Sequence, residues 1–224
     1  MEIAQLQSFV DRLRLETIGE PIWNAEQQVF EYADRTIPVV AILKLLRAAQ
    51  GLVSMEVLRQ AGLFIDFGAT IRMVNDCVEE VYFLLETYPG EPSASVTKFV
   101  TGFFEHTIDN YLEAESEPVP RNKIRNAVVR VLKGGAQDEA TRALTERIYK
   151  TFCGYVHANF AHIMEIYGGN QWGFNLAGVP SVQQREMRRE HTSLATNSIA
   201  FATAFAARKL NRDALHAEIS QAVG

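Results

Sequence analysis

The sequence lacks several features that would identify a class of protein. It has two cysteines in 224 residues, Cys77 and Cys153, which lie far apart and form no Cys-x-x-Cys pair. A disulfide-rich scaffold is therefore excluded, and the chain fits a reducing cytosol. It also contains no Walker loop, no GxGxxG, no GxSxG and no zinc-finger spacing. Nucleotide-binding, serine-hydrolase and zinc-finger proteins that depend on those motifs are not indicated.

An excess of charge and a long apolar run are also missing. The net charge is −5 and the pI near 5.6, so the surface as a whole is not suited to gripping nucleic acid or anionic lipid, although a local basic patch is compatible with these values. The first sixteen residues mix charged and apolar side chains and lack the apolar core of a signal peptide. The uncharged run Thr192–Ala207 is about 16 residues long, shorter than the ~20 that span a bilayer. We expect a soluble cytoplasmic protein without a membrane partner.

What the sequence does contain is helical periodicity. Apolar residues recur at intervals of three and four, the seven prolines fall where these patterns begin or end, and no alternating strand is evident. The expected helices are Ile3–Thr17, Ile22–Gln50 with a break or kink at Pro38, Val53–Tyr88, Ser93–Leu112, Arg121–Lys133, Asp138–Tyr167 and Val182–Leu210. Gly51 is expected to end the second helix, Ser181 to cap the last one, and the tail after Asn211 to fray.

These patterns predict an all-α fold. We expect one domain, residues 1–224, built as a single helical bundle of about six or seven helices with a long central helix. The acidic connector 113–120 is the candidate subdomain boundary.

The predicted central helix, Val53–Tyr88, has the clearest pattern in the chain. Two sets of residues recur every seven positions: Val57, Phe64, Ile71, Val78 and Leu85, and then Gln60, Phe67, Val74, Val81 and Tyr88. Nine of these ten are apolar, which is a sustained heptad seam. Gly62 and Gly68 each weaken such a helix by roughly 1 kcal/mol relative to alanine, and they indicate places where a neighbouring helix comes close.

The stretch Tyr149–Gly169 concentrates histidine, cysteine and tyrosine. His157 and His162 are five residues apart, about 140° around a helix, so they cannot clamp one metal ion as an HExxH pair does. A zinc site on Cys153 and His157 would need two further ligands, and no second cluster supplies them. We therefore predict no metal and no cofactor, with Cys153 facing the core and His157 hydrogen-bonded to another helix.

The loop Gly168–Pro180 carries Trp172 and Phe174 among glycines and could include a short hairpin. Three interpretations stay open for its aromatic residues: a lid over a pocket, the anchor of a dimer interface, or a packed cover for the end of the bundle. In the first case the ligand-binding residues would be Tyr155, His157 and Trp172.

Two basic clusters are candidates for contact with phosphate or RNA. The first comprises Arg121, Lys123, Arg125, Arg130 and Lys133, without an intervening acid, and the second comprises Arg185, Arg188 and Arg189. If the clusters met in space they could hold a nucleic-acid backbone; separately, each would be a solvated helix face. On the central helix, Arg72, Asp76, Glu79 and Glu80 are interpreted as surface ion pairs.

A family resemblance adds one catalytic hypothesis. The long helix with Arg72, Asp76 and Glu79, followed by a later helix with Tyr149 and the run Tyr155-Val156-His157, resembles uncharacterised bacterial HEPN-like helical-bundle proteins over about half the chain. The resemblance implies a bundle of four or five helices, often dimeric, in some members a ribonuclease of defence or toxin–antitoxin systems. Catalytic members carry Arg-x(4–6)-His on a helix, and here only Arg185-x5-His191 fits.

With 16 arginines and 5 histidines in 224 residues, chance alone predicts roughly one such match, so the motif by itself is no evidence for catalysis and the favoured hypothesis is non-catalytic. We expect a cytoplasmic interaction or accessory protein of bacterial type that forms a homo-oligomer, in the first instance a homodimer, or binds another protein. One alternative is a HEPN-like, metal-independent ribonuclease with Arg185 and His191 as catalytic residues, which makes RNA a candidate partner. The other is a small-ligand-binding bundle.

Overall fold

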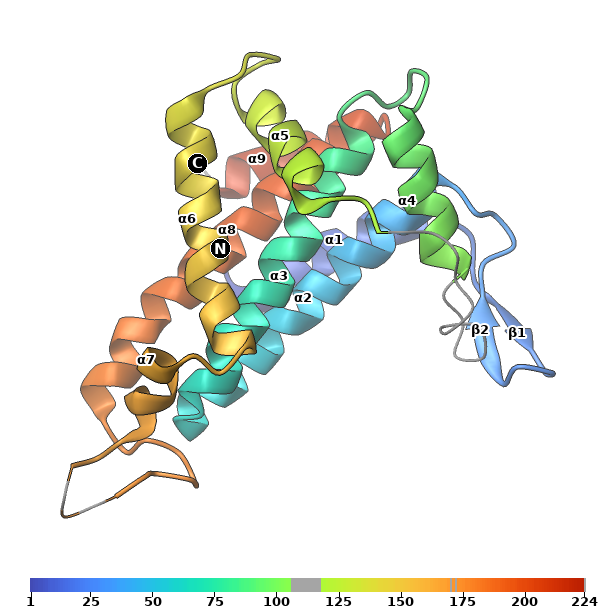
Figure 1. Cartoon of the computed structure of the whole chain (residues 1–224). Helices are drawn as coiled ribbons and strands as arrows, with labels where there is room; N and C mark the ends of the chain where they lie inside the picture. The colour runs from blue at the N-terminus through green and yellow to red at the C-terminus, as the bar shows by residue number, and fades with distance from the viewer. Residues whose placement is uncertain (106–117, 170, 172, 224) are drawn as a thin grey trace.

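The computed structural model describes residues 1–105, 118–169, 171 and 173–223, and it confirms the all-α prediction. The described residues contain nine α-helices, one 3-10 helix and one two-stranded sheet (Figure 1). The α-helices are α1 Ile3–Thr17, α2 Ile37–Ala61, α3 Phe64–Leu85, α4 Ala94–Glu105, α5 Arg121–Leu132, α6 Glu139–Val156, α7 Phe160–Ile163, α8 Val182–Lys209 and α9 Asp213–Val223; the 3-10 helix is η1 Met164–Ile166. The connector 113–117 and the end of the helix expected over Ser93–Leu112 lie outside the described residues.

The prediction of one continuous central helix over Val53–Tyr88 is wrong, because the chain reverses at Gly62. This residue ends α2 in the left-handed region, with φ of 73°, and α3 starts two residues later. A side chain is costly in that region, so glycine is the residue that permits the turn. The helices α2 and α3 therefore pack side by side as an antiparallel pair through the middle of the bundle (Figure 1).

The heptad seam is real only within α3. Its members from Phe64 to Leu85 are buried, whereas Val57, the first member, is 60% exposed on α2. The expectation that Gly51 ends a helix is also wrong, since α2 runs through it. A Cβ atom on Gly51 would come within 2.5 Å of Val74 on α3, so this glycine serves close packing of the helix pair.

The helices α1 and α8 pack against the α2–α3 pair, and α9 packs against α8. The tail predicted to fray is the helix α9, which buries Leu215 and Ile219 completely and is tied to α1 by two hydrogen bonds of 2.6 and 3.0 Å from Arg12 to Glu218. The predicted cap of α8 is confirmed, because the Ser181 hydroxyl accepts the Gln184 N–H at 3.2 Å. Small residues along α8, among them Ala202 and Ala206, are fully buried.

The prediction of a helix that starts at Ile22 is wrong for the residues before Ile37. Residues Ile22–Asn24 (β1) and Val29–Glu31 (β2) form an antiparallel hairpin in which the rings of Trp23 and Phe30 meet edge to face at 5.0 Å. Three residues per strand are too few to display alternation in a sequence.

Among the described helices, α2 is the one that is long and apolar enough to cross a membrane, by length and composition alone. Half of its most apolar window is buried within the bundle, as in the core helix of a folded domain.

The turn at Gly62 gives a direct test of the fold. A Cβ atom there would lie 2.3 Å from the Val179 carbonyl oxygen, in addition to the strain of a positive φ. We expect Gly62→Ala to lower the free energy of unfolding by about 2–4 kcal/mol, from strain plus overpacking. The control is Gly134→Ala, where φ is +61° but a Cβ meets nothing within 4 Å. Gly134→Ala should lower the free energy of unfolding by only about 1–2 kcal/mol. If urea titrations showed the same decrease in the free energy of unfolding for both variants, the packing argument would be contradicted.

Candidate functional site

The chain leaves α6 through a tight reversal that produces an apolar tip. Ala158 takes a left-handed conformation with φ of 50°, and the Asn159 N–H returns to the Gly154 carbonyl oxygen at 2.9 Å. The helix predicted to continue to Tyr167 therefore stops at Val156, and α7, η1 and a loop follow. In that loop Tyr167 and Phe174 form a single antiparallel bridge with ring centroids 5.2 Å apart.

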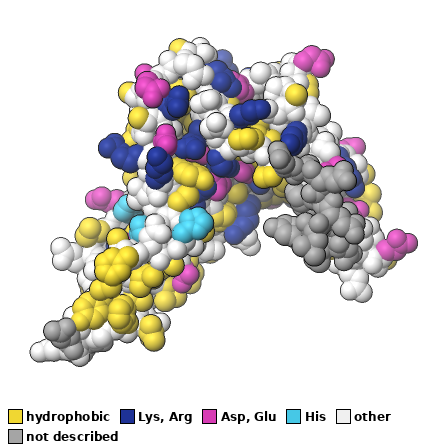
Figure 2. Space-filling model, in the orientation of Figure 1, with side chains coloured by type: hydrophobic (Ala, Val, Ile, Leu, Met, Phe, Trp, Pro, Cys, Tyr) yellow, Lys and Arg dark blue, Asp and Glu magenta, His cyan; other side chains and the backbone are white. Residues whose placement is uncertain are grey.

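The name apolar tip is used here for six exposed side chains on this segment: Val156, Phe160, Ile163, Tyr167, Phe174 and Leu176. Phe160 and Leu176 are the most exposed, at 80% and 82%. Figure 2 shows apolar side chains gathered over this end of the molecule. Trp172, the third predicted ligand-binding residue, lies outside the described residues.

Tyr155 supports the tip from inside. Its ring lies against Gly68 on α3, where a Cβ atom would come within 2.3 Å of the ring, so the close helix approach predicted at Gly68 is confirmed. Its hydroxyl donates to Glu165 Oε1 at 2.7 Å. Burial, and then this hydrogen bond, raises the pKa of Tyr155 to about 12. The residue predicted to bind a ligand is thus engaged by its own chain.

Glu165 links the tip to α8 and α3. Its second carboxylate oxygen accepts a hydrogen bond from Arg188 Nη2 on α8. The Arg188 guanidinium in turn lies 4.1 Å from the centroid of the Phe64 ring at the start of α3. Three elements are held by one partly buried ion pair, which is strong when its remaining hydrogen bonds are also satisfied.

The two histidines of the stretch have separate positions. His162 meets the Tyr155 ring edge to face at 4.0 Å and lies over Gly154, where a Cβ atom would come within 2.2 Å of the imidazole. His157 is the exposed cap residue at the end of α6. The structure therefore places Tyr155 inside the tip and His157 on its surface, and it does not bring them into one cavity.

Arg185 and His191 do not converge within one copy of the chain. They are six residues apart on α8, about 120° around the helix. Arg185 donates to the Pro180 carbonyl oxygen at 3.0 Å, whereas the exposed His191 ring meets Phe152 at 6.3 Å.

Cys153 pairs with an arginine. Its sulfur accepts a hydrogen bond from Arg72 Nε at 3.3 Å, and the Arg72 guanidinium lies 4.0 Å from the centroid of the Tyr149 ring. The guanidinium of Arg125 approaches the same ring at 4.5 Å. These contacts join α3, α5 and α6.

The charged residues of α3, interpreted as surface ion pairs, form a partly buried network. Arg72 and Glu80 are each only 9% exposed. Arg121 at the start of α5 donates to Glu79 and Glu80, both at 2.7 Å, and to Asp76. Lys44 on α2 approaches Glu80 at 2.7 Å, and burial raises the pKa of Glu79. The sequence contained a signal for this pairing. Acidic residues of α3 lie outside its heptad positions, and the start of α5 is basic and contains no acid.

Most of the two basic clusters is neutralised in the same way. Arg130 pairs with Glu86 and Lys133 with Asp138 in the first cluster, while Arg188 pairs with Glu165 and Arg189 with Glu186 in the second. Within the part of the chain that the structure describes, no group of three or more His, Cys, Asp or Glu side chains is arranged to hold a metal ion.

Comparison of the chain with protein-family models, curated proteins and solved structures gives no match.

The Tyr155 hydroxyl provides a test of how the tip is supported. Its raised pKa means that the folded state keeps a proton which the unfolded chain loses near pH 10, so stability falls as pH rises from about 10 to about 12. Tyr155→Phe should lower the free energy of unfolding by about 1 kcal/mol at pH 8. Between pH 8 and pH 11 the free energy of unfolding should fall less in this variant than in the wild type. Urea unfolding at both values measures this.

The matched control is Tyr149→Phe, whose hydroxyl makes no hydrogen bond to a carboxylate among the described residues. It should change the stability at pH 8 by less than about 0.5 kcal/mol. An identical alkaline slope in wild type and Tyr155→Phe would show that Tyr155 keeps no such proton.

Proposed function

We propose that this protein is a helical-bundle interaction protein that pairs with a second copy of itself through the apolar tip. The observation that carries the proposal is the exposure of several apolar side chains, three of them aromatic, on one short segment at the end of the bundle. Phe160, Tyr167 and Phe174 are 80%, 38% and 48% exposed. For aromatic side chains of ~200 Å² each, their summed exposed surface is on the order of 300 Å². Leu176 adds to this area, and exposed apolar patches of such size mark interaction sites.

The absence of charge in the sequence of this segment favours a second copy as the occupant. Between Lys150 and Arg185 the only Asp, Glu, Lys or Arg is Glu165, and its carboxylate is held inside by Tyr155 and Arg188. A two-fold interface brings the same surface of both copies together, so a charged patch would meet its own sign. A neutral apolar patch meets no such penalty, and interface cores are depleted of charged residues.

The same property argues against a nucleic acid at the tip. Binding to a phosphate backbone depends on lysine and arginine side chains that displace counterions, and the tip offers none. The HEPN-like ribonuclease stays a prediction that would require Arg185 and His191 to meet across two copies. Both cysteines are free, which supports the proposed cytoplasmic setting.

The dimer is tested by sedimentation velocity of the full chain. The double variant Phe160→Asp, Leu176→Asp should weaken self-association about a hundredfold or more, because each copy loses two apolar contacts worth about 1.5–3 kcal/mol apiece and gains buried charge. The association of the wild type should persist from low to high salt, since no exposed ion pair contributes to it.

The matched control is Leu194→Asp. Leu194 is 66% exposed on α8 and lies outside the tip, so this change adds a charge at a comparable apolar position. Its dimer should be unchanged, and circular dichroism should show the same helix content in all variants. A monomeric wild type, or dissociation of Leu194→Asp to the same extent, would contradict the proposal.

A further inference from the structure

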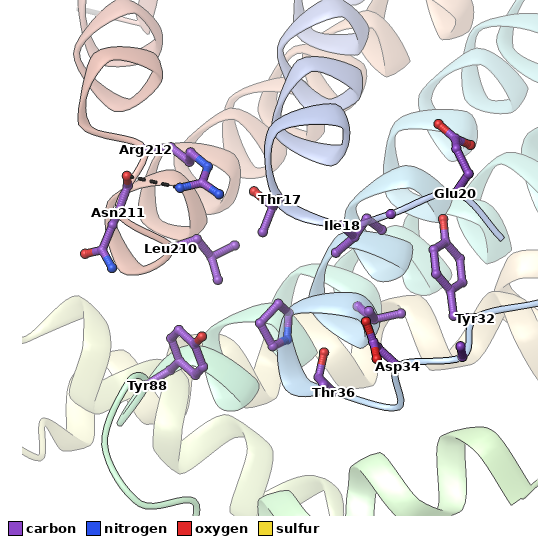
Figure 3. A pocket seen from close by; sticks show the side chains of 14 residues that line it. Thr17, Ile18, Glu20, Tyr32, Asp34, Thr36, Tyr88, Leu210, Asn211 and Arg212 are labelled. Carbon is purple, nitrogen blue, oxygen red and sulfur yellow. Dashed lines mark hydrogen bonds between the residues drawn. The ribbon is translucent and has the colours of Figure 1, made fainter.

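A polar pocket lies at the end of the bundle opposite the tip. It is enclosed by the end of α1, the segment before α2, Tyr88 after α3, and the turn between α8 and α9, and it has a volume of about 400 Å³. In Figure 3, Thr17 and Ile18 line one side, Tyr88 and Thr36 the facing side, and Asn211 and Arg212 close one end. The volume is within the range of small-molecule sites.

Three helices point their carboxyl ends toward this region: α1, α3 and α8. The last turn of a helix carries unpaired carbonyl groups and the negative end of the helix dipole, and both favour a cation. The protein already uses its own cations here. Arg212 Nε donates to the Glu16 carbonyl oxygen at 2.9 Å, and Lys209 Nζ donates to those of Glu86 and Tyr88 at 2.8 and 3.1 Å.

The side chains of the pocket add further groups that suit a cation. Asp34 lines it and has no ion-pair partner within the described part of the chain, whereas Glu20 pairs with Arg14 at 2.9 Å. Tyr32 and Tyr88 supply aromatic rings, whose faces attract ammonium and guanidinium groups.

Two features of the pocket act in the opposite direction, the amino end of α2 and Arg212. The amino end of α2 would favour an anion, but Pro38 in its first turn has no N–H to offer. Arg212 is a cation, and its hydrogen bonds from Nε and Nη2 to the neutral Glu16 carbonyl oxygen hold its guanidinium in place without removing its charge. Since Arg212 and Lys209 occupy the carbonyl oxygens of Glu16, Glu86 and Tyr88, the Asp34 carboxylate is the group of the lining that can pair with a bound cation.

We propose that this pocket binds a small organic cation, an amine or guanidinium compound, between the Asp34 carboxylate and the rings of Tyr32 and Tyr88. One carboxylate beside two aromatic rings favours positive charge without fixing the shape of the compound that carries it. The site thus accepts an elongated polar cation rather than an apolar or acidic compound. It is independent of self-association, because its lining residues contain no member of the apolar tip.

Agmatine, which carries an ammonium at one end and a guanidinium at the other, is the probe. Isothermal titration of the full chain should show saturable binding, and the thermal unfolding midpoint should rise with agmatine concentration. Sodium chloride at matched ionic strength and succinate, a dianion of similar length, should produce neither effect.

Two variants locate the binding. Asp34→Asn should weaken agmatine binding about tenfold, because it removes the charge and keeps the shape. Gly19→Phe should abolish it: Gly19 lines the pocket and an added Cβ there meets nothing within 4 Å, so the ring can enter without a backbone clash. Glu91→Gln, an exposed acid in the turn before α4, is the matched control and should bind as the wild type.

The proposal is overturned by no saturable heat with agmatine, by tighter binding of succinate, or by equal agmatine affinity in wild type and Asp34→Asn. Circular dichroism and the unfolding midpoint without ligand verify that each variant is folded, so that loss of binding reports on the pocket. Self-association measured in the same samples separates this result from that of the tip variants.

Discussion

The Gly62 carbonyl oxygen accepts a hydrogen bond from the Val179 N–H at 2.9 Å, and the arrangement of the bundle depends on this backbone contact. Two left-handed glycines make it feasible, Gly62 at the turn between α2 and α3 and Gly178 on the incoming loop, where a Cβ atom would lie 2.0 Å from the Ala61 carbonyl oxygen. The contact fixes the reversal of the chain and the starting point of α8 together. Arg59 on α2 reinforces it by donating to the Arg185 carbonyl oxygen at 3.2 Å.

Once α8 starts at that point, Arg188 falls beside Phe64 and within reach of Glu165. The same turn places Gly68 in the first part of α3, where its missing side chain admits the Tyr155 ring. The tip can therefore be apolar outside and still be held firmly, because its only carboxylate and its tyrosine hydroxyl satisfy each other inside. A surface for self-association needs this preorganisation, since ordering a flexible segment on binding would cost affinity.

The sequence predicts the helical class and the buried face of α3 because both depend on local periodicity. It does not predict the reversal at Gly62, because the seven-residue repeat runs from Val57 to Phe64 in phase across the break. The break becomes visible only in the structure, where Phe64 is buried in α3 and Val57 is exposed on α2. The tail helix α9 was missed for a related reason: Leu215 and Ile219 are four residues apart, too short a stripe to outweigh the expectation that chain ends fray.

The candidate site was predicted less well than the fold because partners are set by tertiary packing. Sequence spacing put Cys153 beside His157, whereas the structure gives that sulfur to Arg72 from α3. The pocket around Asp34 and Thr17 had no sequence signal, since its lining comes from four separate segments. Because α2 alone spans ~37 Å at 1.5 Å per residue, the pocket and the tip lie too far apart to share a ligand. A change at one end could reach the other only through the packed pair of α2 and α3, and their turn at Gly62 leaves little freedom for such a shift.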